Sequence, residues 1–161
     1  MVVSLLVLLF SSALISGSEV AFFSLSPTQL KDLESSSIQN DKIILSLIVH
    51  PQKLLATILI TNNFMNIAIV ILSTYILSSI EALHHLSIIY IFLIEVIGVT
   101  FLILLFGEVL PKVYATYQPL KLARFMSGPM LFLGKLLSPF SYLLIHSTSF
   151  IDNRIAQKKK P

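Results

Sequence analysis

The sequence predicts an all-α integral membrane protein, built from three transmembrane helices and a cytoplasmic juxtamembrane helical belt. Hydrophobic residues make up 55% of the 161 residues and charged residues 12%, and the mean hydropathy is +0.89. Soluble domains are about 25% charged. Three apolar runs each reach the length of about 20 residues that a helix needs to cross a bilayer. The chain contains no cysteine, which excludes disulfide and thiolate–metal chemistry, and it has no basic patch of the kind that binds nucleic acid.

The first span is predicted over about residues 2–25 and contains a polar island, Ser16-Gly17-Ser18-Glu19. A signal peptide is the alternative, but the run has no basic start and no small-residue cleavage site, so we expect it to be retained. Small residues in a span often serve helix packing. A carboxylate beside two hydroxyls favours a functional role instead, because charge within a membrane is costly.

Residues 28–53 are predicted to form a short helical hairpin, and the residues just before them signal its start. Ser26 and Gln29 fit a capping box, with Pro27 at the first helical position. A break is expected near residues 35–37. The second half has an apolar face at helical spacing that should lie on the membrane or on the other helices: Ile43, Ile44, Leu47 and Ile48.

The second span, about residues 54–80, carries three amides within five positions, at Asn62, Asn63 and Asn66. Asn62 and Asn66 are one helical turn apart and share a face. An interhelical hydrogen bond is the simpler explanation, and such bonds contribute about 0.6 kcal/mol in membranes. Three amides exceed what joining two helices requires, which favours a role in binding a ligand or ion.

The third span, about residues 86–107, ends in Phe106-Gly107-Glu108-Val109-Leu110-Pro111-Lys112. Because proline has no backbone N–H, Pro111 cannot donate to the Gly107 carbonyl. That carbonyl and the Glu108 carboxylate would then be two hard oxygens side by side, which suit a small hard cation. The alternative is that Pro111 ends the helix and Glu108 is a solvated terminal charge.

Other polar residues of the spans and their loop are weaker candidates. Glu95, in the middle of the third span, is either a second functional carboxylate or a protonated, hydrogen-bonded one. Glu81, His84 and His85 in the short loop are a poor metal site, because adjacent histidines do not share a helix face. No Ser–His or paired-Asp arrangement lies within the spans, so we do not expect an enzyme.

The belt is predicted over about residues 118–150 as amphipathic pieces at the membrane interface. The run is apolar, but basic residues and prolines interrupt it: Lys121, Arg124, Lys135, Pro129 and Pro139. The proline pair is expected to bend it twice. A fourth span here would place the lysine-rich tail outside the cell, whereas basic residues near membrane spans favour the cytoplasmic side.

Orientation follows from the basic residues. Three lysines lie in residues 28–53 and the other eight of the 11 basic residues follow the third span. Three spans put both regions on one side, so the positive-inside rule places the C-terminus in the cytoplasm and the N-terminus outside. Asn62 and Asn66 then lie roughly 12–18 Å from the start of their span. Glu108 falls nearer the cytoplasmic edge, a mismatch that needs tilt, a break at Gly107, or a cavity open to the cytoplasm.

Three stretches carry a resemblance to a known family. Residues 15–21 (ISGSEVA) with 24–26 (SLS), residues 55–63 (LATILITNN) through Asn66, and residues 106–112 (FGEVLPK) resemble, in order and spacing, three motifs of the CorC/CNNM family of magnesium and cobalt efflux proteins. The family's transmembrane (DUF21) domain has three spans and a juxtamembrane belt, and forms a homodimer. Residues 113–116 (VYAT) are similar to gliding-motility-associated members.

The resemblance implies a cation site, with Mg²⁺ as the transported ligand. Its expected ligands are Ser16, Asn62, Asn66, the Gly107 carbonyl and Glu108. Four neighbours are possible additions: Ser18, Glu19, Asn63 and Pro111. The sequence departs from the family where Thr61 replaces a glycine and where Glu95 has no counterpart.

The resemblance also implies the function and the partners. We expect a divalent cation transporter of the plasma (inner) membrane that exports Mg²⁺, with Na⁺ as a candidate driving ion. The alternative is a non-transporting sensor or assembly subunit whose cation pocket is structural. Expected partners are a second copy of the chain, membrane lipid, and a cytoplasmic CBS-pair domain that is absent from residues 1–161 and follows in the full-length chain.

Overall fold

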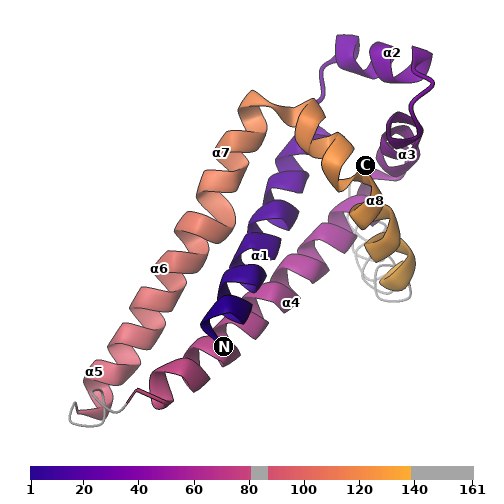
Figure 1. Ribbon diagram of the computed structural model, residues 1–161. Coiled ribbons are helices and arrows are strands. Elements are labelled where there is room, and N and C mark those ends of the chain that lie inside the picture. The colour runs from indigo at the N-terminus through magenta and orange to yellow at the C-terminus, as the bar shows by residue number, and fades with distance from the viewer. Residues whose placement is uncertain (81–86, 139–161) are drawn as a thin grey trace, which may run out of the picture.

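A computed structural model describes residues 1–80 and 87–138, and this part of the chain contains helices and no strands. Three helical runs in it are long and apolar enough to cross a membrane: α1 (Val2–Phe23), α4 (Pro51–Ser78) and a composite third span, Ile88–Tyr117. Figure 1 shows α1 between α4 and the third span, with the short helices gathered at one end. The predicted all-α membrane fold is confirmed.

The third span continues past residue 107, where the sequence suggested that it ends. It consists of α5 (Ile88–Leu93), η2 (Ile94–Val99), α6 (Thr100–Leu102), η3 (Ile103–Val109) and α7 (Leu110–Tyr117). The segments η2 and η3 are π-helical, with hydrogen bonds that reach one residue further than in an α-helix.

The sequence placed Glu108 nearer the membrane edge than Asn62 and Asn66. Because the third span continues as a helix beyond Glu108, no break at Gly107 is needed to bring these residues to the same depth. The π-helical stretch leads directly into α7, so Pro111 lies within a continuous helical run and removes one backbone hydrogen bond from it. Glu108 therefore lies about 13 Å before the end of the helical run at Tyr117, at a rise of about 1.5 Å per residue. The carboxylate belongs to the interior of the span and not to its terminus.

The predicted hairpin is present as α2 (Pro27–Ser35) and α3 (Gln39–Ile48). Its capping box is complete, because the Gln29 backbone N–H donates to the Ser26 hydroxyl at 3.2 Å and the Ser26 N–H donates to Gln29 Oε1 at 2.9 Å. The expected break near residues 35–37 falls between the two helices.

The belt begins with α8 (Pro119–Leu136), which packs against α1, α3 and α4. One face of α8 contributes to the main core, and the opposite face exposes apolar side chains: Phe125, Phe132 and Leu136. This two-sided character agrees with an interfacial helix. Pro129 lies within α8, which stays one helix across it, so the first of the two expected bends does not divide the belt. Pro139 and the rest of the belt lie outside the described residues.

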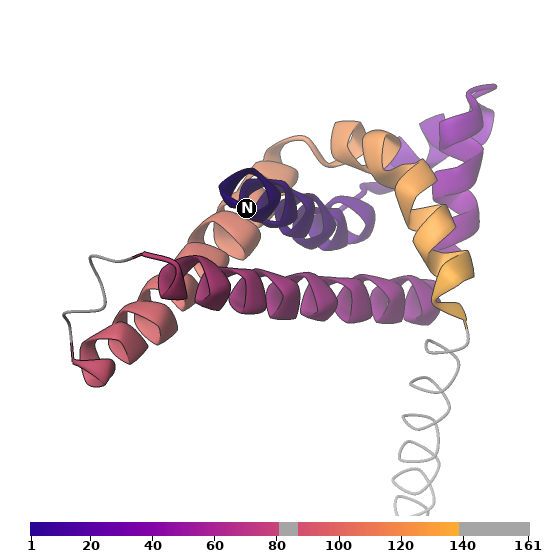
Figure 2. The same ribbon diagram turned by 60° about the horizontal axis from the view of Figure 1, so that its bottom comes forward.

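An ion pair between Asp41 and Arg124 joins α3 to α8. Arg124 donates from Nε to Asp41 Oδ1 at 2.7 Å and from Nη2 to Oδ2 at 2.9 Å. The Asp41 side chain is fully buried. The Arg124 guanidinium, more than any other neighbour, holds the pKa of Asp41 below its usual range. Figure 2 shows α8 meeting the start of α4 at this end of the molecule.

Candidate cation site

Polar side chains from the three spans meet around Glu108. Asn66 Nδ2 donates to Glu108 Oε1 at 3.1 Å, and Asn62 Nδ2 donates to the same oxygen at 3.4 Å. The Oδ1 atoms of both asparagines accept from the hydroxyl of Ser12, at 3.2 Å from Asn62 and 3.0 Å from Asn66. The shared face of α4 predicted from the sequence therefore links a serine of α1 to the carboxylate of the third span.

Two glycines bring α1 and the third span close together. A Cβ added to Gly107 would lie 3.3 Å from the Ser12 hydroxyl oxygen, and one added to Gly17 would lie 3.2 Å from the Pro111 carbonyl oxygen. Ser12 and Gly17 follow each other along α1 as Gly107 and Pro111 do along the third span, so the two helices run parallel there. A side chain at either position would make these contacts tighter than ordinary packing, so the neighbouring atoms would have to shift.

Ser16 lies one turn after Ser12 on α1, between the two close contacts. Its side chain is 1% exposed, and its hydroxyl oxygen is buried with no hydrogen-bond partner in the described part of the chain. A buried hydroxyl without a partner costs about 1–3 kcal/mol. The Ser16 hydroxyl is therefore a buried oxygen that could bind a ligand, and it lies beside the helix that carries Glu108.

The four additional candidates lie near the cluster but are engaged elsewhere or face away. Lys112 Nζ pairs with Glu19 Oε2 at 2.9 Å. The Ser18 hydroxyl donates to the Leu14 carbonyl at 2.6 Å within α1. Asn63 is exposed on α4, and no hydrogen bond joins it to the cluster. Pro111 contributes the backbone that contacts Gly17.

The remaining polar residues of the spans do not join the cluster. Glu95 accepts a hydrogen bond from the Thr74 hydroxyl, in a separate contact between α4 and η2. The Thr61 hydroxyl donates to the Thr57 carbonyl at 2.7 Å. Glu81, His84 and His85 lie outside the described residues. Within residues 1–80 and 87–138, no three His, Cys, Asp or Glu side chains gather as a metal cluster, and the groups bonded to Glu108 are two neutral amides.

The hydrogen-bond network around Glu108 can be inverted. A side-chain amide has nearly the same shape after a half-turn, which exchanges Oδ1 and Nδ2. In the structure the single Ser12 proton is shared between two amide oxygens, although a hydroxyl can also accept two hydrogen bonds. Turning both amides would give Ser12 two N–H donors and would aim both Oδ1 atoms at the Glu108 carboxylate. The two Oδ1 atoms and Glu108 Oε1 would then converge on one point.

Ser12 was not identified from the sequence. It lies within the apolar part of α1, before the polar island, and it is completely buried. The signal that could have found it is its spacing of one helical turn from Ser16, which places both hydroxyls on the same face.

The family model described as the cyclin M transmembrane N-terminal domain (CNNM) matches residues 3–160, nearly the whole chain. A search of curated proteins found no match. CNNM domains are associated with divalent cation transport. Three membrane-spanning helices, a half-buried carboxylate bonded to neutral amides and a match over this length agree with one another. The protein therefore belongs to the CNNM family of multi-pass membrane proteins.

Proposed function

We propose that this domain transports Mg²⁺ out of the cytoplasm through a site centred on Glu108. The observation that supports this most strongly is the meeting of one carboxylate with two amides from α4, within the spans of a family associated with divalent cation transport. An unbalanced carboxylate in a membrane is costly. A divalent cation would offset that cost.

In this proposal, the amides of Asn62 and Asn66 rotate when the cation binds. Their N–H groups, which donate to Glu108 in the structure, would repel a cation. After rotation, both Oδ1 atoms face the ion and both N–H groups donate to Ser12. The Ser16 hydroxyl and the Gly107 carbonyl complete the set of hard oxygen ligands, and water supplies the others because Mg²⁺ dehydrates reluctantly.

The composition of this ligand set suits transport. One carboxylate and several neutral oxygens bind a divalent cation more weakly than a cage of several carboxylates would. The existing hydrogen bonds also compete with the ion, because each amide must leave Glu108 before its oxygen can coordinate. Both effects favour release, which every transport cycle requires.

The Glu19–Lys112 ion pair lies on the proposed path between the site and the cytoplasm. Lys112 follows Glu108 by one helical turn, and Glu19 follows Ser16 by nearly one turn on α1. Because the basic residues cluster at the end of the domain formed by α2, α3 and α8, we place this end in the cytoplasm. A cation entering from that side meets Glu19 first.

We further propose that the domain is a symmetric homodimer and that Na⁺ entry drives export. Two-fold dimers are the commonest symmetric assembly. The third span supports a dimer surface, because only 11% of its most apolar window is buried, against 39% for α1 and 33% for α4. The Na⁺ proposal follows from the family resemblance alone.

A sensor or assembly subunit is the second candidate. The observation that favours it is that Ser12, both asparagines and one carboxylate oxygen of Glu108 form one hydrogen-bonded network, as side chains in a purely structural role would. Mg²⁺ flux separates the two. Purified protein in liposomes loaded with a fluorescent Mg²⁺ indicator should give saturable Mg²⁺ entry above that of empty liposomes. Tight Mg²⁺ binding without flux would favour the sensor.

A further inference from the structure

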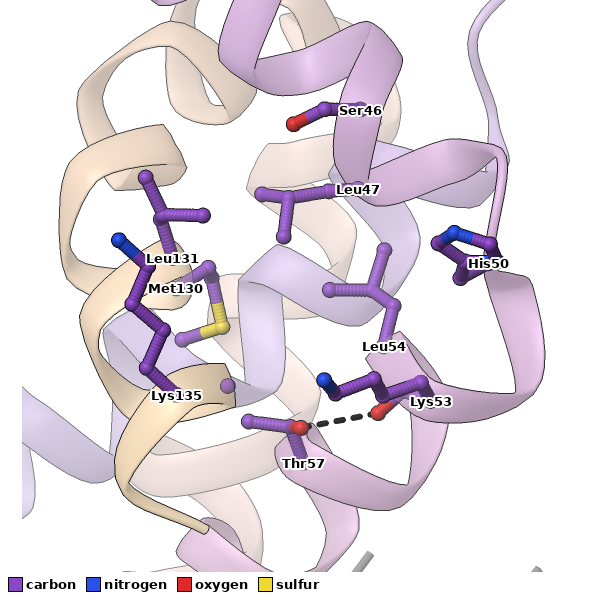
Figure 3. Close-up of a pocket in the computed structure, with 10 residues that line it drawn as sticks. Ser46, Leu47, His50, Lys53, Leu54, Thr57, Met130, Leu131 and Lys135 are labelled. Atoms are coloured by element: carbon purple, nitrogen blue, oxygen red, sulfur yellow. Dashed lines mark hydrogen bonds between the residues drawn. The ribbon is translucent and has the colours of Figure 1, made fainter. Parts of the chain in front are cut away.

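A cavity between α3, α4 and α8 is separate from the residues around Glu108. Its volume is about 200 Å³, several times the roughly 30 Å³ that one water molecule takes up in the liquid. Figure 3 shows the side chains around it. Apolar side chains from all three helices form its wall: Leu47, Leu54, Met130 and Leu131.

Positive charge borders this apolar wall. Lys53 and Lys135 line the cavity, and no Asp or Glu does. Neither lysine forms an ion pair with any described residue. In Figure 3 the Lys53 amine extends toward the middle of the cavity, while Lys135 runs along α8 beside Leu131. Two unpaired ammonium groups next to apolar side chains are complementary to a molecule with an anionic head and an apolar body.

The cavity lies where lipid headgroups would be. Lys53 is in the first turn of α4, at the end of a predicted membrane span. On the outer face of α8, Phe132 is 65% exposed and Leu136 is 60% exposed, next to the cavity-lining Lys135. Exposed aromatic and aliphatic side chains on an interfacial helix insert at the boundary between headgroups and acyl chains, and basic pockets between helices at this depth bind anionic headgroups.

We propose that this cavity binds an anionic phospholipid, with its phosphate between Lys53 and Lys135 and its glycerol region against Leu54 and Met130. The lipid site shares no residue with the proposed Mg²⁺ site and does not depend on the direction of transport. A bound lipid would join α3, α4 and α8 at the membrane surface.

Two kinds of variant test the site by independent routes, with dioleoyl phosphatidylglycerol as the probe. The double variant Lys53→Gln with Lys135→Gln removes the charges. Lys42→Gln with Lys121→Gln is the control, because it removes two exposed lysines of α3 and α8 that do not line the cavity. Gly134→Leu places a large side chain in the cavity with both lysines kept, because Gly134 lines the cavity opposite Thr57 and an added Cβ would lie 3.9 Å from Thr57 Oγ1. Gly134→Ala is its size control.

The measurement is retention of phosphatidylglycerol by the purified 161-residue chain in native mass spectrometry, with a parallel thermal-shift titration. We expect Lys53→Gln with Lys135→Gln to weaken binding about 30-fold, from the contribution of two lysines near a membrane surface. Gly134→Leu should weaken it similarly, whereas Lys42→Gln with Lys121→Gln and Gly134→Ala should bind as the unchanged chain does.

Several results would overturn the assignment. Equal loss in both lysine pairs would indicate diffuse electrostatic attraction, and normal binding by Gly134→Leu would place the lipid elsewhere. Equal retention of dioleoyl phosphatidylcholine would remove the role of the anionic charge. Displacement of phosphatidylglycerol by an equal concentration of inorganic phosphate would show a free-anion site in which the apolar wall contributes nothing.

Discussion

Glu108→Gln should weaken Mg²⁺ binding by at least about 30-fold. Two unit charges 4 Å apart attract by about 1 kcal/mol in water and about 4 kcal/mol at an effective dielectric constant of 20. A dication doubles both values. The lower limit is therefore about 2 kcal/mol, which corresponds to about 30-fold in the dissociation constant.

The Glu108→Gln variant should still fold. Glutamine has the same shape, and its amide oxygen can accept from Asn62 and Asn66 as the Glu108 Oε1 atom does. Exchanging charge-assisted for neutral hydrogen bonds costs about 1 kcal/mol each. Thermal unfolding in detergent without Mg²⁺ should therefore show a small decrease in melting temperature, separate from the loss of binding.

Isothermal titration of the purified protein with Mg²⁺ measures the effect. Glu95→Gln is the matched control, because it makes the same substitution in the same span at a carboxylate bound to Thr74. Its affinity should be unchanged, and Asn66→Ala should lose about 10-fold, from one amide ligand. Undiminished binding in Glu108→Gln, or an equal loss in Glu95→Gln, would refute the assignment of the site.

Three further predictions concern packing, the belt and orientation. Gly17→Ala should lower stability by about 1–3 kcal/mol, because the new Cβ would lie 3.2 Å from the backbone carbonyl oxygen of Pro111 as well as 3.0 Å from Leu122 Cδ2. Gly98→Ala, with nothing within 4 Å, should leave stability unchanged. Equal melting temperatures of the two variants would contradict this. Arg124→Gln should cost about 3 kcal/mol by leaving a buried carboxylate unpaired. In the unchanged chain, the lowered pKa of Asp41 stabilises the fold above about pH 4, and that contribution should disappear as pH falls through the lowered value. Urea unfolding between pH 3 and pH 7 measures both the loss of stability in Arg124→Gln and its pH dependence. If Arg124→Gln had the same pH dependence as the unchanged chain, the ion pair would not be its cause. A single cysteine at Lys121 should resist an impermeant thiol reagent added to intact cells, and labelling there would reverse the proposed orientation.

Local rules predicted much of the fold and three of the four residues of the hydrogen-bonded cluster, all except Ser12. The capping box at Ser26 depends on residues three apart, and the shared face of Asn62 and Asn66 on helical periodicity, so both can be read without tertiary information. Glu108 stood out because a carboxylate beside a glycine and a proline is unusual in an apolar run. The structure brings this carboxylate to the two predicted asparagines.

Tertiary contacts decided what the sequence did not show. Pro111 suggested an early end to the third span, but the π-helical turns of η3 and the packing against α1 carry the helix on to Tyr117. Glu19 was a candidate ligand, and only the fold shows that Lys112 pairs with it. Ser12 looked like one small residue in an apolar run until α4 placed two amides against it.

The most direct test of the proposed cation site is a crystal structure of the domain grown with Mn²⁺ in place of Mg²⁺, with the ion located by its anomalous scattering. We expect the ion at about 2.1 Å from the Glu108 carboxylate, with the Oδ1 atoms of Asn62 and Asn66 turned toward it and their N–H groups donating to Ser12. An ion bound at Glu95 or Glu19, with both amides still donating to Glu108, would contradict the proposal.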